Sequence, residues 1–246
     1  MPLALTLRNI TKHFTDGNTK KFLALKDISF EINAGEFFIL LGPSGSGKST
    51  LLRIMSGLEK DYQGELKLGQ NITSADISFV FQQFALMPWL TVYQNIELAL
   101  DPKKITAGEK KEKIIAELKR LDLEKFADSY PRELSGGMKQ RVGIARALVK
   151  NPKIIFMDEP FSELDSFTAQ ELRSEILKIW NETKTTIVMV THLIEEALEL
   201  GDRIAILTPL PGKIEKIVPN HLPRPRAKRS ADFFEYMDHI YKLIKP

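Results

Sequence analysis

Residues 37–50 read Phe37-Phe38-Ile39-Leu40-Leu41-Gly42-Pro43-Ser44-Gly45-Ser46-Gly47-Lys48-Ser49-Thr50, and they decide the fold of this chain. The first five are apolar, which is typical of a strand buried on both faces of a parallel sheet. The residues that follow match G-x-x-x-x-G-K-[ST], and a helical pattern comes directly after them. Glycines let such a loop wrap around phosphates, where a Cβ would clash. The stretch therefore predicts a phosphate-binding loop at the end of a central strand.

The composition is that of an ordinary globular protein, with 246 residues, 43% hydrophobic and 27% charged. This length is enough for one sizeable α/β domain. A formal net charge of +3 is too small to indicate nucleic-acid binding. The absence of cysteine excludes disulfides and cysteine-ligated metals. No apolar run reaches the length of a membrane span, so we expect a soluble protein whose membrane role, if any, comes through a partner.

Apolar runs like the one before the loop recur further along the chain, at residues 77–81, 154–157, 187–190 and 204–207. Helical patterns separate the last three, which favours an α/β fold with a mostly parallel sheet and helices on both faces. Residues 3–7 and 28–32 alternate in polarity and predict two further strands, with turn chemistry at residues 15–18 between them.

Residues 91–150 depart from this alternation. They contain no convincing strand, and apolar residues recur there at helical spacing, which predicts a helical insertion. After Pro219, the Pro/Arg-rich residues 221–226 predict an extended linker. The basic residues 224–229 are expected to be solvated, with anionic lipid headgroups as the alternative contact. A last helix is expected to place five residues on one face: Phe233, Met237, Ile240, Tyr241 and Ile244.

A second anion-binding feature lies in the helical insertion, in residues 134–141, LSGGMKQR. Ser135-Gly136-Gly137 forms a turn with few side-chain atoms before a helical pattern, and its N–H groups would favour an anion. One ATP needs only one phosphate cradle. We therefore expect this second site to close over an ATP that is held by another copy of the domain.

Together these motifs resemble the ATP-binding cassette (ABC) ATPases, whose signature reads LSGGQ; this chain has Met138 in place of the Gln. The resemblance covers nearly the whole chain. It implies a P-loop NTPase core with a mostly parallel sheet, an N-terminal antiparallel β subdomain and an inserted α-helical subdomain. The expected ABC ATPase domain spans residues 1–220, with the helical subdomain at about 84–150, and residues 221–246 form a C-terminal linker and helix.

The resemblance also implies ATP and Mg²⁺ as cofactors. Lys48 would bridge phosphate oxygens, and the Ser49 hydroxyl would ligate Mg²⁺. Phe14 lies where the family stacks an aromatic ring on adenine, with Phe22 as a weaker competitor. The expected nucleotide-binding residues are Phe14, Gly42, Pro43, Ser44, Gly45, Ser46, Gly47, Lys48, Ser49, Thr50, Gln82, Ser135, Gly136, Gly137 and Asp165.

Two carboxylates end the apolar run at residues 154–157. In a P-loop fold, Asp158 would lie on the Mg²⁺ side, and Glu159 is the best candidate for polarising the attacking water. The ordinary alternative is a pair of solvated acids at a strand end, which the order of the motifs outweighs. The expected metal residues are Ser49, Gln82 and Asp158, and the expected catalytic residues are Glu159, His192, Lys48 and Gln82.

Three single residues match the switches of the ABC family. Gln82 resembles the Q-loop glutamine that senses the γ-phosphate, although a lone Gln after a strand is commonly a polar terminus. His192 follows a strand and resembles the switch histidine, although a lone His is more often structural. Asp165 ends Ser162-Glu163-Leu164-Asp165, which resembles the interface loop usually written SALD; Glu163 departs from that pattern.

A finer resemblance is to the ATPase subunits of nitrate, sulfonate and taurine importers, in residues 87–92, 207–214 and 222–226. It implies transmembrane permease subunits, a second copy of the chain or a related cassette, and a substrate-binding protein as partners, with no nucleic acid. The protein would be an ATPase bound peripherally at the cytoplasmic face of the cell membrane.

Three other functions stay open. An ABC exporter or lipid-trafficking ATPase is one of them, although residues 161–165 resemble importers more. A non-transport ABC ATPase acting on DNA or ribosomes would carry a long coiled coil or a second cassette, and this chain has neither. A simple P-loop kinase or NTPase would leave residues 135–137, His192 and Asp165 without a role.

Overall fold

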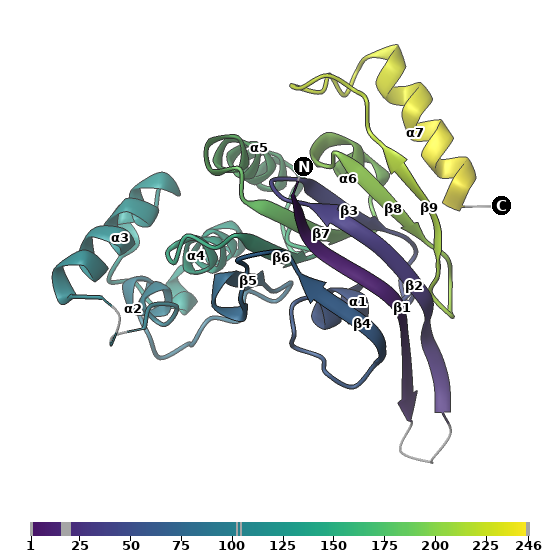
Figure 1. Ribbon diagram of the computed structural model, residues 1–246. Coiled ribbons are helices and arrows are strands. Elements are labelled where there is room, and N and C mark those ends of the chain that lie inside the picture. Colours follow the sequence, from purple (N-terminus) through teal and green to yellow (C-terminus); the bar gives the residue numbers. More distant parts are fainter. Residues whose placement is uncertain (1, 16–20, 102, 104, 245–246) are drawn as a thin grey trace. The chain divides into compact units, whose positions relative to one another are not determined.

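The computed structural model describes residues 2–15, 21–101, 103 and 105–244, and it has the α/β architecture that the sequence predicts (Figure 1). The chain divides into two compact units. Unit 1 comprises Met1–Ser74 and Lys184–Pro246, and unit 2 comprises Ala75–Thr183.

Unit 1 contains the N-terminal antiparallel sheet. Its strands are ordered β2-β1-β4, with bounds β1 (Leu3–Thr15), β2 (Lys21–Asn33) and β4 (Gln63–Leu68). Apolar side chains on one face of β1 and β2 are buried, including Leu5, Leu7 and Ile28, as the alternating pattern predicts. Of the predicted turn at residues 15–18, Thr15 ends β1, and residues 16–18 lie outside the described residues.

Unit 1 also contains the strand before the phosphate loop. The strands lie in the order β7-β3-β8-β9, parallel except for β9, with bounds β3 (Phe37–Leu41), β7 (Thr186–Thr191), β8 (Arg203–Leu207) and β9 (Ile214–Pro219). Every residue of β3 is buried, as its continuous apolar run predicts. The described residues of this unit form three α-helices: α1 (Lys48–Met55), α6 (Ile194–Leu200) and α7 (Ala231–Ile244).

Helix α7 packs on α6 and β8 at the C-terminal end of the chain (Figure 1). Phe233 and Ile240 are buried and Met237 is half-buried, as expected. Tyr241 is 49% exposed, contrary to the predicted face. At about 100° per residue, position 241 is rotated roughly 80° from position 233, so it leaves the buried stripe.

Unit 2 holds the helical insertion and a pair of parallel strands, β5 (Ile77–Val80) and β6 (Ile154–Asp158). Its α-helices are α2 (Val92–Glu97), α3 (Ala107–Arg120), α4 (Gly136–Leu148) and α5 (Ser166–Thr183), and its short 3₁₀ turns include Glu124–Phe126 and Pro131–Glu133. Among its described residues, the stretch from 91 to 150 contains no strand, as expected. No helix in the described part of either unit combines the length and apolar character needed to cross a membrane.

Candidate functional site

The phosphate loop lies between β3 and α1, and its lysine is held inside it. Lys48 is 4% exposed, and its ammonium donates to the carbonyl oxygens of Gly42 and Pro43, both at 2.9 Å. Gly45 and Gly47 have φ values of 78° and 87°, which favour glycine because a side chain there is strained. The backbone of the phosphate loop therefore surrounds the Lys48 ammonium.

The loop is supported from behind by a second glycine turn. A Cβ at Gly47 would lie 2.6 Å from Leu25 Cδ2, and a Cβ at Gly212 would overlap the Ser46 carbonyl oxygen. Gly212 is also held by β2, since its N–H donates to the Ala24 carbonyl at 2.9 Å. Residues 207–214, singled out in the sequence for a resemblance, therefore form part of the loop's support.

His192 belongs to unit 1 and lies on the two-residue connection from β7 to α6. Its side chain is exposed, whereas Thr191 beside it is buried. The Thr191 hydroxyl accepts from the Leu193 N–H at 3.1 Å and donates to the Glu196 carboxylate at 2.6 Å. His192 thus lies in a turn whose flanking residues, Thr191 and Leu193, are joined by a hydrogen bond. The sequence did not predict this turn.

The two candidate adenine-stacking residues form one pair. Phe14 and Phe22 face each other across β1 and β2, and their rings stack with centroids 5.6 Å apart. The Lys12 ammonium lies 4.8 Å from the Phe14 centroid, a cation–π arrangement. Phe22 is 47% exposed and Phe14 is half-buried, so the pair presents one aromatic surface.

In unit 2, the two candidate carboxylates follow each other at the end of β6. Asp158 is the last residue of the strand and is 5% exposed. Glu159 is half-buried and has a φ of 41°. Positive φ is uncommon for a residue with a side chain, and such strain gathers at functional sites. The chain thus turns sharply at Glu159, away from the strand direction that Asp158 continues.

Gln82 is tied to the loop that follows Glu159. Its side-chain amide donates to the Ser162 hydroxyl at 3.2 Å, and that hydroxyl donates to the Glu159 carbonyl at 3.0 Å. Phe84 and Ala85, two and three residues further along the chain, have left-handed backbones. Arg146 of α4 donates to both of their carbonyl oxygens, at 3.0 and 2.6 Å. No sequence pattern singled out Arg146 for this contact.

The signature turn begins α4. Ser135 is the N-cap, and its hydroxyl accepts from the Met138 N–H at 3.3 Å. The helix therefore begins at Gly136, two residues before Met138, where the helical pattern of the sequence starts. Gly136 and Gly137 form its first turn. A Cβ at Gly137 would overlap Thr168 Cγ2, whereas one at Gly136 would meet nothing closer than 3.6 Å. The requirement for glycine at position 137 therefore comes from packing within unit 2.

Asp165 anchors the interface loop to the start of α5. Its carboxylate accepts from the N–H groups of Phe167 and Thr168 at 3.1 Å and from the Thr168 hydroxyl at 2.6 Å. These hydrogen bonds, led by the one from the Thr168 side chain, lower the pKa of Asp165. Thr168 thus connects Asp165 to Gly137, and the signature turn and the interface loop share one packed surface.

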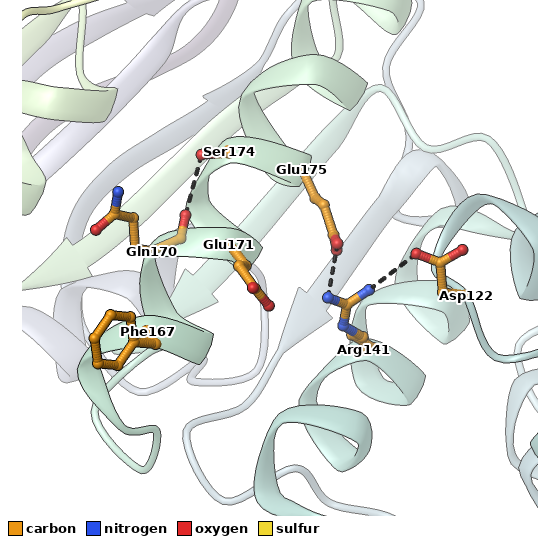
Figure 2. A pocket seen from close by; sticks show the side chains of 7 residues that line it. All are labelled: Asp122, Arg141, Phe167, Gln170, Glu171, Ser174 and Glu175. Atoms are coloured by element: carbon orange, nitrogen blue, oxygen red, sulfur yellow. Dashed lines mark hydrogen bonds and ion pairs between the residues drawn. The ribbon is translucent and has the colours of Figure 1, made fainter.

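A pocket of about 630 Å³ lies beside α4 and α5 in the same unit (Figure 2). Arg141 lies between two carboxylates, 2.7 Å from Glu175 and 3.8 Å from Asp122. Burial raises the pKa of Glu175, and the neighbouring Arg141 opposes the shift. None of the predicted nucleotide residues lines this pocket, so we do not assign it to ATP.

Among the described residues, no three His, Asp or Glu side chains gather in a way that could hold a metal ion by themselves. Mg²⁺ commonly keeps several waters and binds through one or two protein oxygens together with substrate phosphates. In unit 2, the Asp158 carboxylate and the Gln82 amide offer oxygens of this kind, and in unit 1 the Ser49 hydroxyl does.

The ABC transporter family model matches residues 25–162. The chain is 43% identical to an aliphatic sulfonates import ATP-binding protein of Bacillus cereus, over 99% of this chain and 96% of the relative. It is 40% identical to a nitrate import ATP-binding protein of Synechocystis, over 93% and 91% of the two chains. A solved dimeric ATP-binding cassette with bound ADP and phosphate superposes with a TM-score of 0.78 at 38% identity, covering 88% of this chain and 99% of that chain. This chain therefore belongs to the ABC transporter family and is one of its ATP-hydrolysing cassettes.

Proposed function

We propose that this chain is the ATPase subunit of an importer for a small anion such as nitrate, a sulfonate or taurine. The observation that carries the proposal is similarity along nearly the whole chain to two import ATPases, one for aliphatic sulfonates and one for nitrate. Both cargoes are small oxyanions. The exporter and non-transport alternatives have no comparable observation in their favour.

ATP binding would begin at the phosphate loop, residues 42–50. Its N–H groups and the start of α1 favour negative charge, because the helix dipole is positive there. The Lys48 ammonium donates to the carbonyl oxygens of Gly42 and Pro43, and we expect it to turn to the phosphate oxygens of a bound nucleotide. Phe14, paired with Phe22, offers the aromatic surface for adenine.

Mg²⁺ would be held by Ser49, Gln82 and Asp158, and when bound it would neutralise charge on the phosphates. The protein groups have separate tasks. Glu159 would accept the proton of the attacking water as general base. His192 would donate a hydrogen bond to the γ-phosphate. Gln82 would sense whether the γ-phosphate is present.

The signature turn would complete the site of a second copy. Its Ser135 hydroxyl and the N–H groups of Gly136 and Gly137 suit the γ-phosphate of an ATP that is bound by the other subunit, which can be identical or a related cassette. The dimeric state of the solved cassette supports this arrangement. ATP would then join the two copies and ADP would not, so that hydrolysis reopens the dimer.

We further propose that permease subunits bind this chain at the cytoplasmic face of the membrane, and that a substrate-binding protein delivers the anion. The chain would consist of an ABC ATPase domain at residues 1–220, with its helical subdomain at about 84–150, and a C-terminal linker and helix at 221–246.

The test is purification of the tagged chain from detergent-solubilised membranes of its source, with mass spectrometry of what accompanies it. We expect a polytopic permease in fixed proportion, and ATPase activity that Lys48→Ala abolishes. Uptake of labelled sulfonate and nitrate by vesicles containing the complex then identifies the anion. Recovery of the chain without any membrane protein, or uptake independent of Lys48, would contradict the proposal.

A further inference from the structure

Residues 220–230, which we name the C-terminal strap, form an irregular segment with two different faces, bent at residues 224–225 and turned at residues 228–229. Even-numbered residues are half-buried and odd-numbered residues are exposed throughout. Arg224, Arg226 and Lys228 are all on the half-buried face, whereas Arg229 is exposed. The solvated linker expected from the sequence is therefore wrong for three of these four basic residues, because each of the three contacts helix α6 or the residues just after it.

Side chains of the strap donate hydrogen bonds to the carbonyl groups at the C-terminal end of α6. The Asn220 amide donates to the carbonyls of Leu198 and Gly201 at 2.9 and 3.0 Å. The Arg226 guanidinium donates to the Glu199 carbonyl at 3.0 Å, and Arg224 donates to that of Leu200. The last carbonyls of a helix have no partners within it, so these contacts complete the C-terminal end of α6.

Charge strengthens the same attachment. Lys228 lies 2.7 Å from the Glu199 carboxylate and 3.1 Å from that of Glu195, and Arg224 lies 2.9 Å from Asp202. Cations near a helix C-terminus also interact favourably with its dipole. Burial lowers the pKa of Arg226 to about 10, so this guanidinium is still charged at neutral pH.

The opposite end of α6 holds the turn that carries His192. Glu196 is 6% exposed, and it accepts the hydrogen bond from the Thr191 hydroxyl at 2.6 Å. That hydroxyl accepts in turn from the Leu193 N–H. The residues on both sides of His192 are therefore tied to one another and to the first turn of α6.

We propose that the C-terminal strap and the Glu196–Thr191 hydrogen bond position the His192 side chain, with Arg226 and Thr191 as positioning residues for ATP hydrolysis. Helix α6 has seven residues, from Ile194 to Leu200, too few to be stable by itself. The strap holds it from one end, so that the other end presents His192 in one orientation. The inference rests on the proposed role of His192 at the γ-phosphate.

The first test compares steady-state ATP hydrolysis by Arg226→Ala and Arg229→Ala, which remove the same charge from the inner and outer faces of the strap. A misplaced catalytic group lowers kcat by about 10- to 100-fold, and we expect this for Arg226→Ala with the KM for ATP unchanged. Arg226→Lys should recover part of the rate, and Arg229→Ala should behave as wild type. Equal kcat values for the two alanine variants would overturn the proposal.

A second test acts at the other end of α6 and remains informative if Arg226→Ala folds poorly. Thr191→Val removes the hydroxyl at nearly constant volume and should lower kcat without changing KM, whereas Thr191→Ser should restore the rate. Hydrogen exchange over residues 191–200 should quicken in Arg226→Ala. An unchanged exchange rate would overturn the positioning role. A loss of kcat no larger than the fraction of unfolded protein explains would overturn it as well.

His192→Ala separates this inference from the proposed function. If His192→Ala hydrolyses ATP at the wild-type rate, the proposed role of His192 fails. If it is inactive while Arg226→Ala and Thr191→Val are fully active, only the positioning inference fails.

Discussion

Glu159 occupies a left-handed backbone position immediately after the buried Asp158, and its φ of 41° is costly for a residue with a side chain. This geometry turns the Glu159 backbone off the axis of β6. The sequence predicted both carboxylates from their place after an apolar run. It did not predict the strained turn, because no residue type there favours positive φ.

Glu159→Gln is expected to lower kcat by about 10²- to 10⁴-fold, the usual contribution of a general base. Equilibrium binding of ATP should be unchanged, since the amide has the size of the carboxylate. Glu171→Gln, on the exposed face of α5, is the matched control and should hydrolyse ATP normally. Rapid-quench kinetics with titration of ATP measures both quantities. Wild-type turnover in Glu159→Gln would remove Glu159 from the role of base.

Gly137→Ala is expected to destabilise the protein by about 1–3 kcal/mol, the typical effect of overpacking, since the new Cβ overlaps Thr168 Cγ2. Gly136→Ala has room for its methyl group and should keep the wild-type stability. Adding Thr168→Ser to Gly137→Ala removes the clashing methyl and should restore stability. Urea denaturation followed by circular dichroism measures all three. Equal stability of the two alanine variants would show that the contact does not matter.

Arg141→Ala is expected to cost about 1–3 kcal/mol at pH 7, because it leaves the partly buried Glu175 carboxylate without its cation (Figure 2). Burial already raises the pKa of Glu175 above its ordinary 4.5, and the variant should raise it further. A raised carboxyl pKa in the folded state means that the contribution of Glu175 to stability is largest below pH 4.5 and is lost as pH rises through the folded pKa. The difference from wild type should therefore shrink in acid, and a loss independent of pH would contradict this account.

At the scale of elements, the sequence predicted the strands that are buried on both faces. Strands β3, β6, β7 and β8 are continuous apolar runs, and such runs are easily recognised. Strands β4 and β9 did not stand out, because most of their side chains are exposed or half-buried and polar residues interrupt both. Both are paired on one side only, as edge strands are.

The ends of helix α6 could not be predicted either, since its C-terminal partners lie 19 to 27 residues further along the chain. Asn220→Ala would remove both side-chain donors to the carbonyls of Leu198 and Gly201, at a cost of about 1–3 kcal/mol. Lys216→Ala, on the exposed side of β9, is the control. Thermal unfolding by calorimetry measures the difference. An unchanged melting temperature in Asn220→Ala would mean that the cap contributes nothing.

At the scale of the whole molecule, the motifs divide between two units. The phosphate loop and His192 belong to unit 1, and Gln82, Asp158, Glu159, Asp165 and the signature turn belong to unit 2. The sequence predicted the family because each motif is short and local. It did not identify the cargo, since in the proposed complex the permease and the substrate-binding protein select the anion.

We propose that residues 135–137 complete the ATP site of another copy. The most direct test is the mass of Glu159→Gln in solution, measured by light scattering after size exclusion with ATP and with ADP. We predict twice the 28.0 kDa of one chain with ATP and a single chain with ADP. Adding Ser135→Arg should abolish the ATP-bound dimer while ATP binding persists. A single-chain mass for ATP-saturated Glu159→Gln, or a dimer that tolerates Ser135→Arg, would contradict the claim.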